Sequence, residues 1–364
     1  MRAARGRPPG AVAFPWITDG AAFGAATMQA PAGRETPMSS IRSTATPLRL
    51  FGSAAAAALL IAVPLGTARA EFPDKTIEMT TLFGGPAQTT SQVLADLMSK
   101  NIGQPVITVS RPGGGGAIGY TYVQSAPADG YSIVFSSNSI STVYYQGNLP
   151  FNYTALAPIA HIGMEVPVLA VRADSGWKDL KSMQAAAKAS GKKLRVGVSG
   201  LGTFTHLASA ALFNRLGLQV VYIPYGEGRA PAELLGGRVD AALQWSSQFA
   251  PHVKAGTINV LCMTSKDKVD LAIETVTCDS AGATGLDLTI WRGIHAPKDT
   301  PPAAIARLEA SIKQAVESAE FKKAGENLGF TPLFKSAKDF GKLVADNDKE
   351  IGELMTELGI NKKK

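Results

Sequence analysis

Hydrophobic and polar positions along residues 71–364 follow two alternating periods. Strand-type runs and amphipathic helix-type stretches succeed one another at 77–83, 89–101, 106–109, 113–123 and 131–136. Within the first helix-type stretch, the apolar residues that share one helical face are Val93, Leu94, Leu97 and Met98. The β-α-β-α-β order predicts one half of an α/β sheet of the mononucleotide-binding type.

A second series of the same kind follows a Pro-rich stretch. Its strand-type and helix-type runs alternate at 168–171, 177–189, 194–198, 205–216, 220–223, 230–235, 239–243 and 258–263. An extended segment at 288–295 and helices at 302–318 and 339–358 complete the chain. Two α/β series with a late return to the first predict two lobes, each a mostly parallel sheet flanked by helices. We expect 71–172 plus 297–364 to form lobe 1, and 173–296 to form lobe 2.

Residues 1–70 are rich in Ala, Gly, Pro and Arg and do not continue this pattern. From residue 38, a basic start, an apolar run at 50–65 and the sequence Ala68-Arg69-Ala70 match a secretory signal peptide that is cut after Ala70. We expect 1–70 to be a removed leader, with the signal peptide at about 38–70 and translation starting at Met28 or Met38. A retained anchor is the alternative, although the run is short and Ala-rich for a membrane span.

Charge and composition narrow the class of protein. The chain has 364 residues, is 45% hydrophobic and carries a formal net charge of +7. Its mean hydropathy of +0.07 and its ordinary aromatic content exclude a disordered chain and a multi-span membrane protein. Seven arginines and two acidic residues lie in the leader, so the other 294 residues carry a net charge of +2. Those residues contain no basic stripe with interleaved aromatic side chains, and we expect no nucleic-acid partner.

Cys262 and Cys278 both lie in the exported part of the chain. In an oxidising compartment the two cysteines could form one disulfide. Two buried thiols are the alternative, since Cys262 lies in an apolar run.

The sequence contains no complete motif for a dinucleotide, a nucleoside triphosphate or a metal ion. Gly114, Gly116 and Gly119 have the spacing of a dinucleotide fingerprint, but no acidic residue ends the next strand. No P-loop motif occurs, and the four histidines share no ligand spacing on one helix or hairpin. We therefore expect neither a cofactor nor a metal.

The segment 197–201 nearly forms the nucleophile elbow of a serine hydrolase. Leu201 stands where that motif requires glycine, and no carboxylate is marked as a partner for His206. We expect no catalytic residue, and a cleft hydrolase that uses Ser199 and His206 is kept as an alternative.

Two small-residue turns, one in each series, join a strand to the start of a helix. The residues that we expect to contact a ligand are Gly84, Gly85, Ala87, Gln88 and Thr89 in the first turn and Gly202, Thr203, Phe204 and Thr205 in the second. The first N–H groups of a helix have no intrahelical acceptor, and the helix dipole favours negative charge there. Two such turns facing across a cleft predict a carboxylate-binding site.

At these residues the sequence resembles the Bug-type receptors, the extracytoplasmic solute receptors of the tripartite tricarboxylate transporter family. The landmarks of this resemblance lie at 72–73, 103–106, 111–119, 129–131, 202–207, 224–225, 230–237, 291–293 and 296–297. The resemblance implies a two-lobed periplasmic-binding-protein fold of the type II, Venus-flytrap kind. It also implies a periplasmic location, a small organic carboxylate as ligand and a pair of membrane permease subunits as partners. We expect the receptor to be a monomer.

Gln88 stands where many members of that family carry Asp, which makes an amino-acid ligand less expected and leaves di-, tri- and aromatic carboxylates open. Side chains at or after strand ends are expected to contact the distal end of the ligand, namely Ser136, Asn138, Tyr225 and Gln244. For Tyr225 and Gln244, packing within a lobe is the alternative. A sensor that signals to a histidine kinase, instead of a transport receptor, is the alternative function.

Overall fold

The computed structural model describes residues 72–226, 228–271 and 273–363. The predicted leader at 1–70, with its signal peptide, lies outside these residues. Among the described residues, no helix is both long and apolar enough to cross a membrane.

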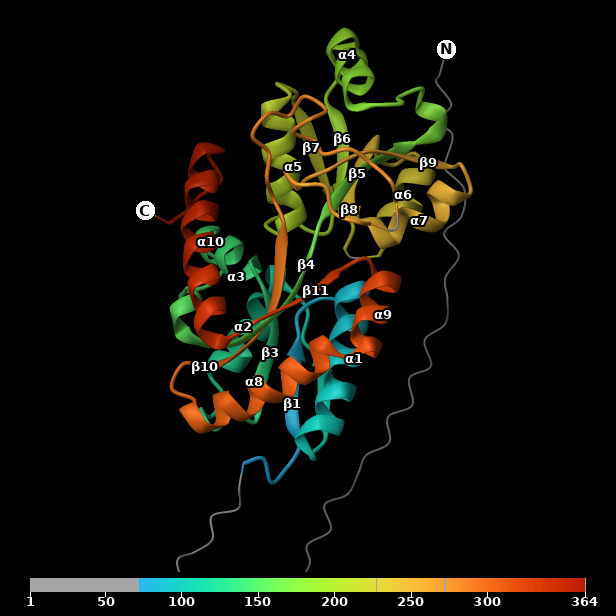
Figure 1. Cartoon of the computed structure of the whole chain (residues 1–364). Coiled ribbons are helices and arrows are strands. Elements are labelled where there is room, and N and C mark those ends of the chain that lie inside the picture. The colour runs from blue at the N-terminus through green and yellow to red at the C-terminus, as the bar shows by residue number, and fades with distance from the viewer. Residues whose placement is uncertain (1–71, 227, 272, 364) are drawn as a thin grey trace, which may run out of the picture. The chain divides into compact units, whose positions relative to one another are not determined.

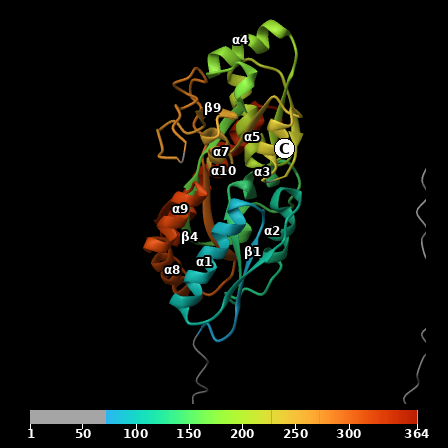
Figure 2. The same ribbon diagram turned by 90° about the vertical axis from the view of Figure 1, so that its right-hand side faces the viewer.

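The first of two sheets has six strands in the order β11-β4-β10-β3-β1-β2. Their bounds are β1 (Ile77–Thr81), β2 (Val106–Ser110), β3 (Ser132–Ser137), β4 (Leu156–Glu165), β10 (Ile290–Pro297) and β11 (Thr331–Lys335). The helices that follow or cover them are α1 (Pro86–Ile102), α2 (Ala117–Gln124), α3 (Ser139–Tyr145), α8 (Pro302–Glu317), α9 (Ala319–Leu328) and α10 (Ala337–Glu357). Figures 1 and 2 both show α1, α8 and α9 side by side.

The second sheet has five strands in the order β7-β6-β8-β5-β9. Its strands are β5 (Pro167–Arg172), β6 (Leu194–Val198), β7 (Val220–Pro224), β8 (Ala241–Trp245) and β9 (Ile258–Met263). Its helices are α4 (Leu180–Ser190), α5 (Phe204–Arg215), α6 (Ala230–Leu235) and α7 (Ser246–Lys254). Each sheet has its own apolar core, because strands buried on both faces pack against helices on either side.

Both sheets are mixed, which corrects the expectation of mostly parallel sheets. β1 pairs in parallel with β2 and β3, and β6 pairs in parallel with β7 and β8. However, β10 runs antiparallel to β3 and β4, and β5 runs antiparallel to β8 and β9. The reason is that β5 and β10 each receive the chain directly from the other sheet. Each of them therefore enters its sheet from the end at which the neighbouring strands leave it.

The chain passes from the first sheet to the second between Glu165, the last residue of β4, and Pro167, the first residue of β5. It returns through the segment that precedes β10. Strand β5 thus belongs to the second sheet and β10 to the first, whereas the expected lobe boundaries after residues 172 and 296 assign each to the other lobe.

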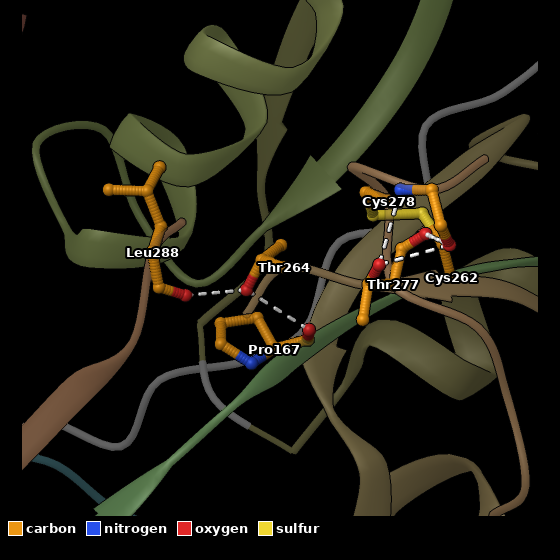
Figure 3. The surroundings of a disulfide bond; sticks show 7 residues. Pro167, Cys262, Thr264, Thr277, Cys278 and Leu288 are labelled. Atoms are coloured by element: carbon orange, nitrogen blue, oxygen red, sulfur yellow. Dashed lines mark hydrogen bonds between the residues drawn. A yellow bond between two sulfur atoms is a disulfide. The ribbon is translucent and has the colours of Figure 1, made fainter. Parts of the chain in front are cut away.

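A disulfide between Cys262 and Cys278 closes the end of β9 onto the following loop (Figure 3). Beside it, the backbone N–H of Thr264 donates to the Pro167 carbonyl at 3.0 Å. The Thr264 hydroxyl donates to the Leu288 carbonyl at 2.7 Å. These bonds join the two segments that pass between the sheets.

Candidate functional site

A narrow cavity lies at the carboxyl ends of strands from both sheets, where ligands of α/β proteins bind. It is lined by Phe83, Ser137, Ser139, Ser199, Thr203, Phe204, Thr205, Trp245, Ile290 and Arg292. Its volume is about 10 Å³, which is room for the centre of about one water molecule. The two sides of the cavity are therefore nearly in contact in this structure.

The N-terminus of α5 forms one wall. Thr203 precedes the helix, and its carbonyl accepts the first helical hydrogen bond, from the N–H of Leu207 at 3.1 Å. The N–H groups at the helix start therefore have no intrahelical acceptor, and the positive end of the helix dipole lies at the cavity. The Thr205 hydroxyl accepts a hydrogen bond from the Ser199 N–H at 3.1 Å, which fixes the turn.

Hydroxyl groups from β3 and α3 form the opposite wall. The Ser137 hydroxyl donates to the Ser139 hydroxyl at 2.9 Å, and the Tyr120 hydroxyl lies 2.9 Å from that of Ser139. Burial raises the pKa of Tyr120, so the phenol stays protonated and remains a hydrogen-bonding partner in this cluster.

Arg292 brings a positive charge to the cavity. Its Nε donates to Glu165 Oε1 at 2.7 Å and its Nη2 donates to Glu165 Oε2 at 3.3 Å. Both side chains are at most 3% exposed, and the guanidinium carbon lies 5.5 Å from the centre of the Trp245 ring. Burial and pairing in this bidentate geometry hold the guanidinium in one place.

Of the second predicted turn, Thr203, Phe204 and Thr205 line the cavity. Gly202 does not: its N–H donates to His206 Nδ1 at 3.2 Å. Gly202 has a φ of +88°, and a Cβ added there would overlap the Gln146 side chain, which follows α3. Gly202 thus marks a close approach between the α3 side and the α5 side of the cavity.

The first predicted turn lies beside the cavity and not in its wall. Gly84 and Gly85 precede α1, and Ala87, Gln88 and Thr89 lie in its first turn. Gly85, Gln88 and Thr89 are exposed. From this region the cavity wall contains Phe83, and a ligand contact by the five predicted residues stays a prediction.

The four residues predicted for the distal end lie around the cavity wall. Ser137, the last residue of β3, and Ser139, the first residue of α3, line the cavity, whereas Ser136 and Asn138 are not in its wall. The Ser136 hydroxyl lies 3.1 Å from the Tyr120 hydroxyl, within the cluster that also contains Ser139. The Asn138 amide donates to the Thr289 carbonyl at 3.1 Å. Gln244 supports the wall from behind, since its amide donates to the Ser199 hydroxyl at 2.9 Å. Tyr225 packs against an apolar cluster of the second sheet, as the packing alternative expects. A ligand contact by the four predicted residues stays a prediction.

The contacts of Ser199 and His206 do not form a hydrolase pair. The Ser199 hydroxyl donates to Gln244 Oε1 at 3.2 Å, while the His206 ring packs edge-on against Tyr222. Burial lowers the pKa of His206, which favours the neutral ring that accepts the Gly202 N–H. Within the described residues, no cluster of three or more His, Cys, Asp or Glu could hold a metal ion.

Sequence reasoning did not assign Arg292 or Trp245 to the site. Arg292 is a charged residue in the otherwise apolar strand 290–297, and its partner Glu165 is 127 positions away. Trp245 follows Gln244 at the end of a strand, next to a residue that the sequence did single out. A charge inside an apolar run was the one local signal that could have found Arg292.

A wider groove of about 710 Å³ lies between α10 and loops of the second sheet. Five acidic side chains line it, those of Asp287, Asp346, Glu350, Glu353 and Glu357, against the two basic side chains of Arg215 and Lys335. The excess of negative charge disfavours an anion, whereas the cavity at α5 combines a helix N-terminus, hydroxyl groups and the ion-paired Arg292. The narrow cavity is therefore the candidate site for an anionic ligand.

The family described as TctC, tripartite tricarboxylate transporter family receptor, matches residues 90–360 of this chain. A relative from Pseudomonas sp. strain P51, the UPF0065 protein in the tcbD-tcbE intergenic region, is 29% identical over 320 residues, covering 84% of this chain and 94% of its own.

The structure of the periplasmic binding protein BugD superposes with a TM-score of 0.73 at 27% identity, over 80% of this chain and 100% of that chain. MatC from Rhodopseudomonas palustris, solved with bound malate, superposes with a TM-score of 0.71 at 22% identity, over 78% of this chain and 99% of its own. These likenesses confirm the expected periplasmic-binding-protein fold.

Proposed function

Because the chain belongs to the receptors of the tripartite tricarboxylate transporter family, we propose that it binds a small organic carboxylate and delivers it to membrane permease subunits. It acts as a monomer in the periplasm, after export by a signal peptide at about residues 38–70. This role is non-enzymatic.

The observation that carries this proposal is the cavity at the N-terminus of α5. Backbone N–H groups at the start of α5, the hydroxyl of Thr205 and the guanidinium of Arg292 surround it. The Thr203 hydroxyl, which also lines the cavity, already donates to the Gly200 carbonyl at 2.8 Å. Hydrogen bonds to a charged group contribute about 1.5–3 kcal/mol each. Three or four of them, less the cost of ordering, reach the roughly −8 kcal/mol of a micromolar ligand.

Ligand exchange requires the two sides of the cavity to separate, since about 10 Å³ holds no organic acid. We infer two lobes, one around each sheet, that rotate about the segments joining β4 to β5 and β9 to β10. The malate bound in MatC lends support to a carboxylate as the ligand here.

A thermal-shift screen of the mature chain against mono-, di-, tri- and aromatic carboxylates tests the proposal. A ligand that binds the folded state raises its stability by RT ln(1 + [L]/Kd), so at least one acid is expected to raise the melting temperature in a saturable way. Thr205→Val should reduce that shift, while Thr257→Val, at an exposed position outside the cavity, should not. Absence of a shift with every acid would contradict the proposal.

Delivery is tested separately by uptake of the acid that binds. Cells that carry a tripartite transporter should take up the labelled acid with this receptor and lose uptake without it. If the receptor binds the acid but uptake does not depend on it, the proposed delivery to a permease is contradicted and the proposed binding stands.

A further inference from the structure

Trp245 carries a hydrogen-bond donor with no acceptor in the described part of the chain. Its side chain lines the cavity and is 2% exposed, and its indole Nε1 is buried and unpaired. By contrast, Nε1 of Trp291 donates to Asn347 Oδ1 at 3.0 Å. Buried donors in folded proteins nearly always have a partner, because an unpaired one loses its hydrogen bonds to water without replacement. The donor of Trp245, in a side chain of the cavity wall, therefore has no partner among the described residues that would compete with a bound molecule.

The charge balance of the cavity leaves room for one negative charge. The positive charge of Arg292 is already matched by Glu165, which is buried with it. The charge that remains uncompensated comes mainly from the positive ends of α5 and α7, each equivalent to roughly half an elementary charge. The short helix α3, of seven residues, also begins in the cavity wall, at Ser139. The α7 helix begins directly after Trp245 and α5 begins at Phe204, so both ends lie at the cavity. Together they balance about one carboxylate.

Apart from Arg292 and the hydroxyl residues at 137, 139, 199, 203 and 205, the cavity wall is apolar. The rings of Phe83, Phe204 and Trp245 and the side chain of Ile290 line it. A second or third carboxylate on the ligand would be buried against these groups without a counter-charge, which is costly. A compact apolar body would instead exclude water from them.

We propose that the ligand is a small monocarboxylic acid with an apolar body, and that the indole N–H of Trp245 donates a hydrogen bond to its carboxylate. This inference rests on the proposed function and narrows its ligand class. It assigns Trp245 as a specificity-determining residue, because the bond is made by the ligand and by no other described group.

Calorimetric titration of the mature chain with benzoate, succinate and citrate as probes tests the ligand class. Benzoate is expected to bind at least tenfold more tightly than succinate or citrate. Tighter binding of succinate or citrate overturns the inference and leaves the proposed function standing. Absence of binding by all three probes, and of any thermal shift in the wider acid screen, overturns both.

Trp245→Phe keeps an aromatic ring and removes the donor. Loss of a hydrogen bond to a charged group should weaken benzoate binding roughly tenfold or more. Trp177→Phe is the matched control, since Trp177 packs against the core of the second sheet outside the cavity wall, and it should leave the affinity within twofold. Equal affinity of wild type and Trp245→Phe for benzoate overturns the role of Trp245.

A second measurement needs no change at Trp245. The mature chain lacks Trp16 and contains the other three tryptophans. Its indole ¹⁵N–H signals are assigned with the Trp177→Phe and Trp291→Phe variants, and the signal left is that of Trp245. Benzoate should shift this signal downfield in a saturable manner, as a new hydrogen bond forms. A saturable shift at the other two indoles with none at Trp245 overturns the inference even if Trp245→Phe does not fold.

Discussion

Arg292 and Glu165 lie diagonally across the pairing of β10 with β4, with 2.7 Å between Nε and Oε1, and both side chains are buried. Glu165 is the last residue of β4, where the chain leaves the first sheet, and Arg292 lies two residues after β10 begins. The ion pair therefore joins the ligand cavity to the segments that pass between the sheets.

Glu165→Gln should destabilise the fold by about 3–5 kcal/mol, because it leaves a buried guanidinium without its counter-charge. Denaturant unfolding of the mature chain measures this loss. The double variant Glu165→Gln/Arg292→Met removes both charges and should recover most of the stability. A loss below about 1 kcal/mol for Glu165→Gln would show that the pair is solvated in solution, as surface pairs are.

Removal of the disulfide by Cys262→Ala/Cys278→Ala should cost about 3 kcal/mol, because the bond closes a loop of 16 residues. Urea unfolding of the double variant and of the oxidised wild type gives the difference. Carboxylate affinity should change less than twofold, since neither cysteine lines the cavity. Equal unfolding midpoints would mean that the bond does not restrict the unfolded chain.

Gly202→Ala should weaken ligand binding only slightly. The added methyl group would overlap the amide end of the Gln146 side chain, which can turn aside without moving the backbone, so we expect less than a threefold loss of affinity for the acid that binds most tightly in the thermal screen. Gly217→Ala is the matched control for the strain of a positive φ, because Gly217 has a φ of +63° and open space around its Cβ position. A tenfold or greater loss in Gly202→Ala that Gly202→Ala/Gln146→Ala restores would show instead that Gln146 is held in place.

Two buried histidines should make the fold less stable in acid. Burial lowers the pKa of His295 to about 3 and that of His161 to about 4. The unfolded chain takes up these protons below about pH 6.5 and the folded chain does not, so stability is full above that pH. It then falls towards pH 4 by about 1.4 kcal/mol per pH unit for each histidine. His295→Gln should reduce this slope in denaturant unfolding at several pH values, and an unchanged slope would contradict the neutral buried ring.

Elements with a strong local period were predictable from the sequence. The apolar run of β9 and the alternation of β6 and α5 have the predicted positions within one or two residues, because burial of one face imposes the pattern. Strand β4 was not predicted, since Pro158, His161 and Gly163 interrupt its apolar run. Its pairing with β10 and β11, both far away in the sequence, overrides the local signal.

Part of the wall of the candidate cavity was predictable for the same reason, while ligand contact by these residues stays a prediction. The turn before α5 has a local signature, and three of its four predicted residues line the cavity. Whether Ser136 or Ser137 lines the cavity depends on which face of β3 turns towards it, and a shift of one residue reverses that face. Asn138 and Ser139 lie at the start of α3, where the alternation of the strand has ended. The pairing of Arg292 with Glu165 depends on which strands lie next to each other, which no local pattern encodes.

Amide NMR of the mature chain titrated with benzoate, and separately with succinate, tests most directly whether a carboxylate binds at the start of α5. The account predicts saturable shifts that are largest at the backbone N–H groups of Phe204, Thr205 and His206, with smaller shifts at Ser137 and Ser139. Saturable shifts confined to other parts of the chain, such as the acidic groove beside α10, would contradict it, as would the absence of any saturable shift.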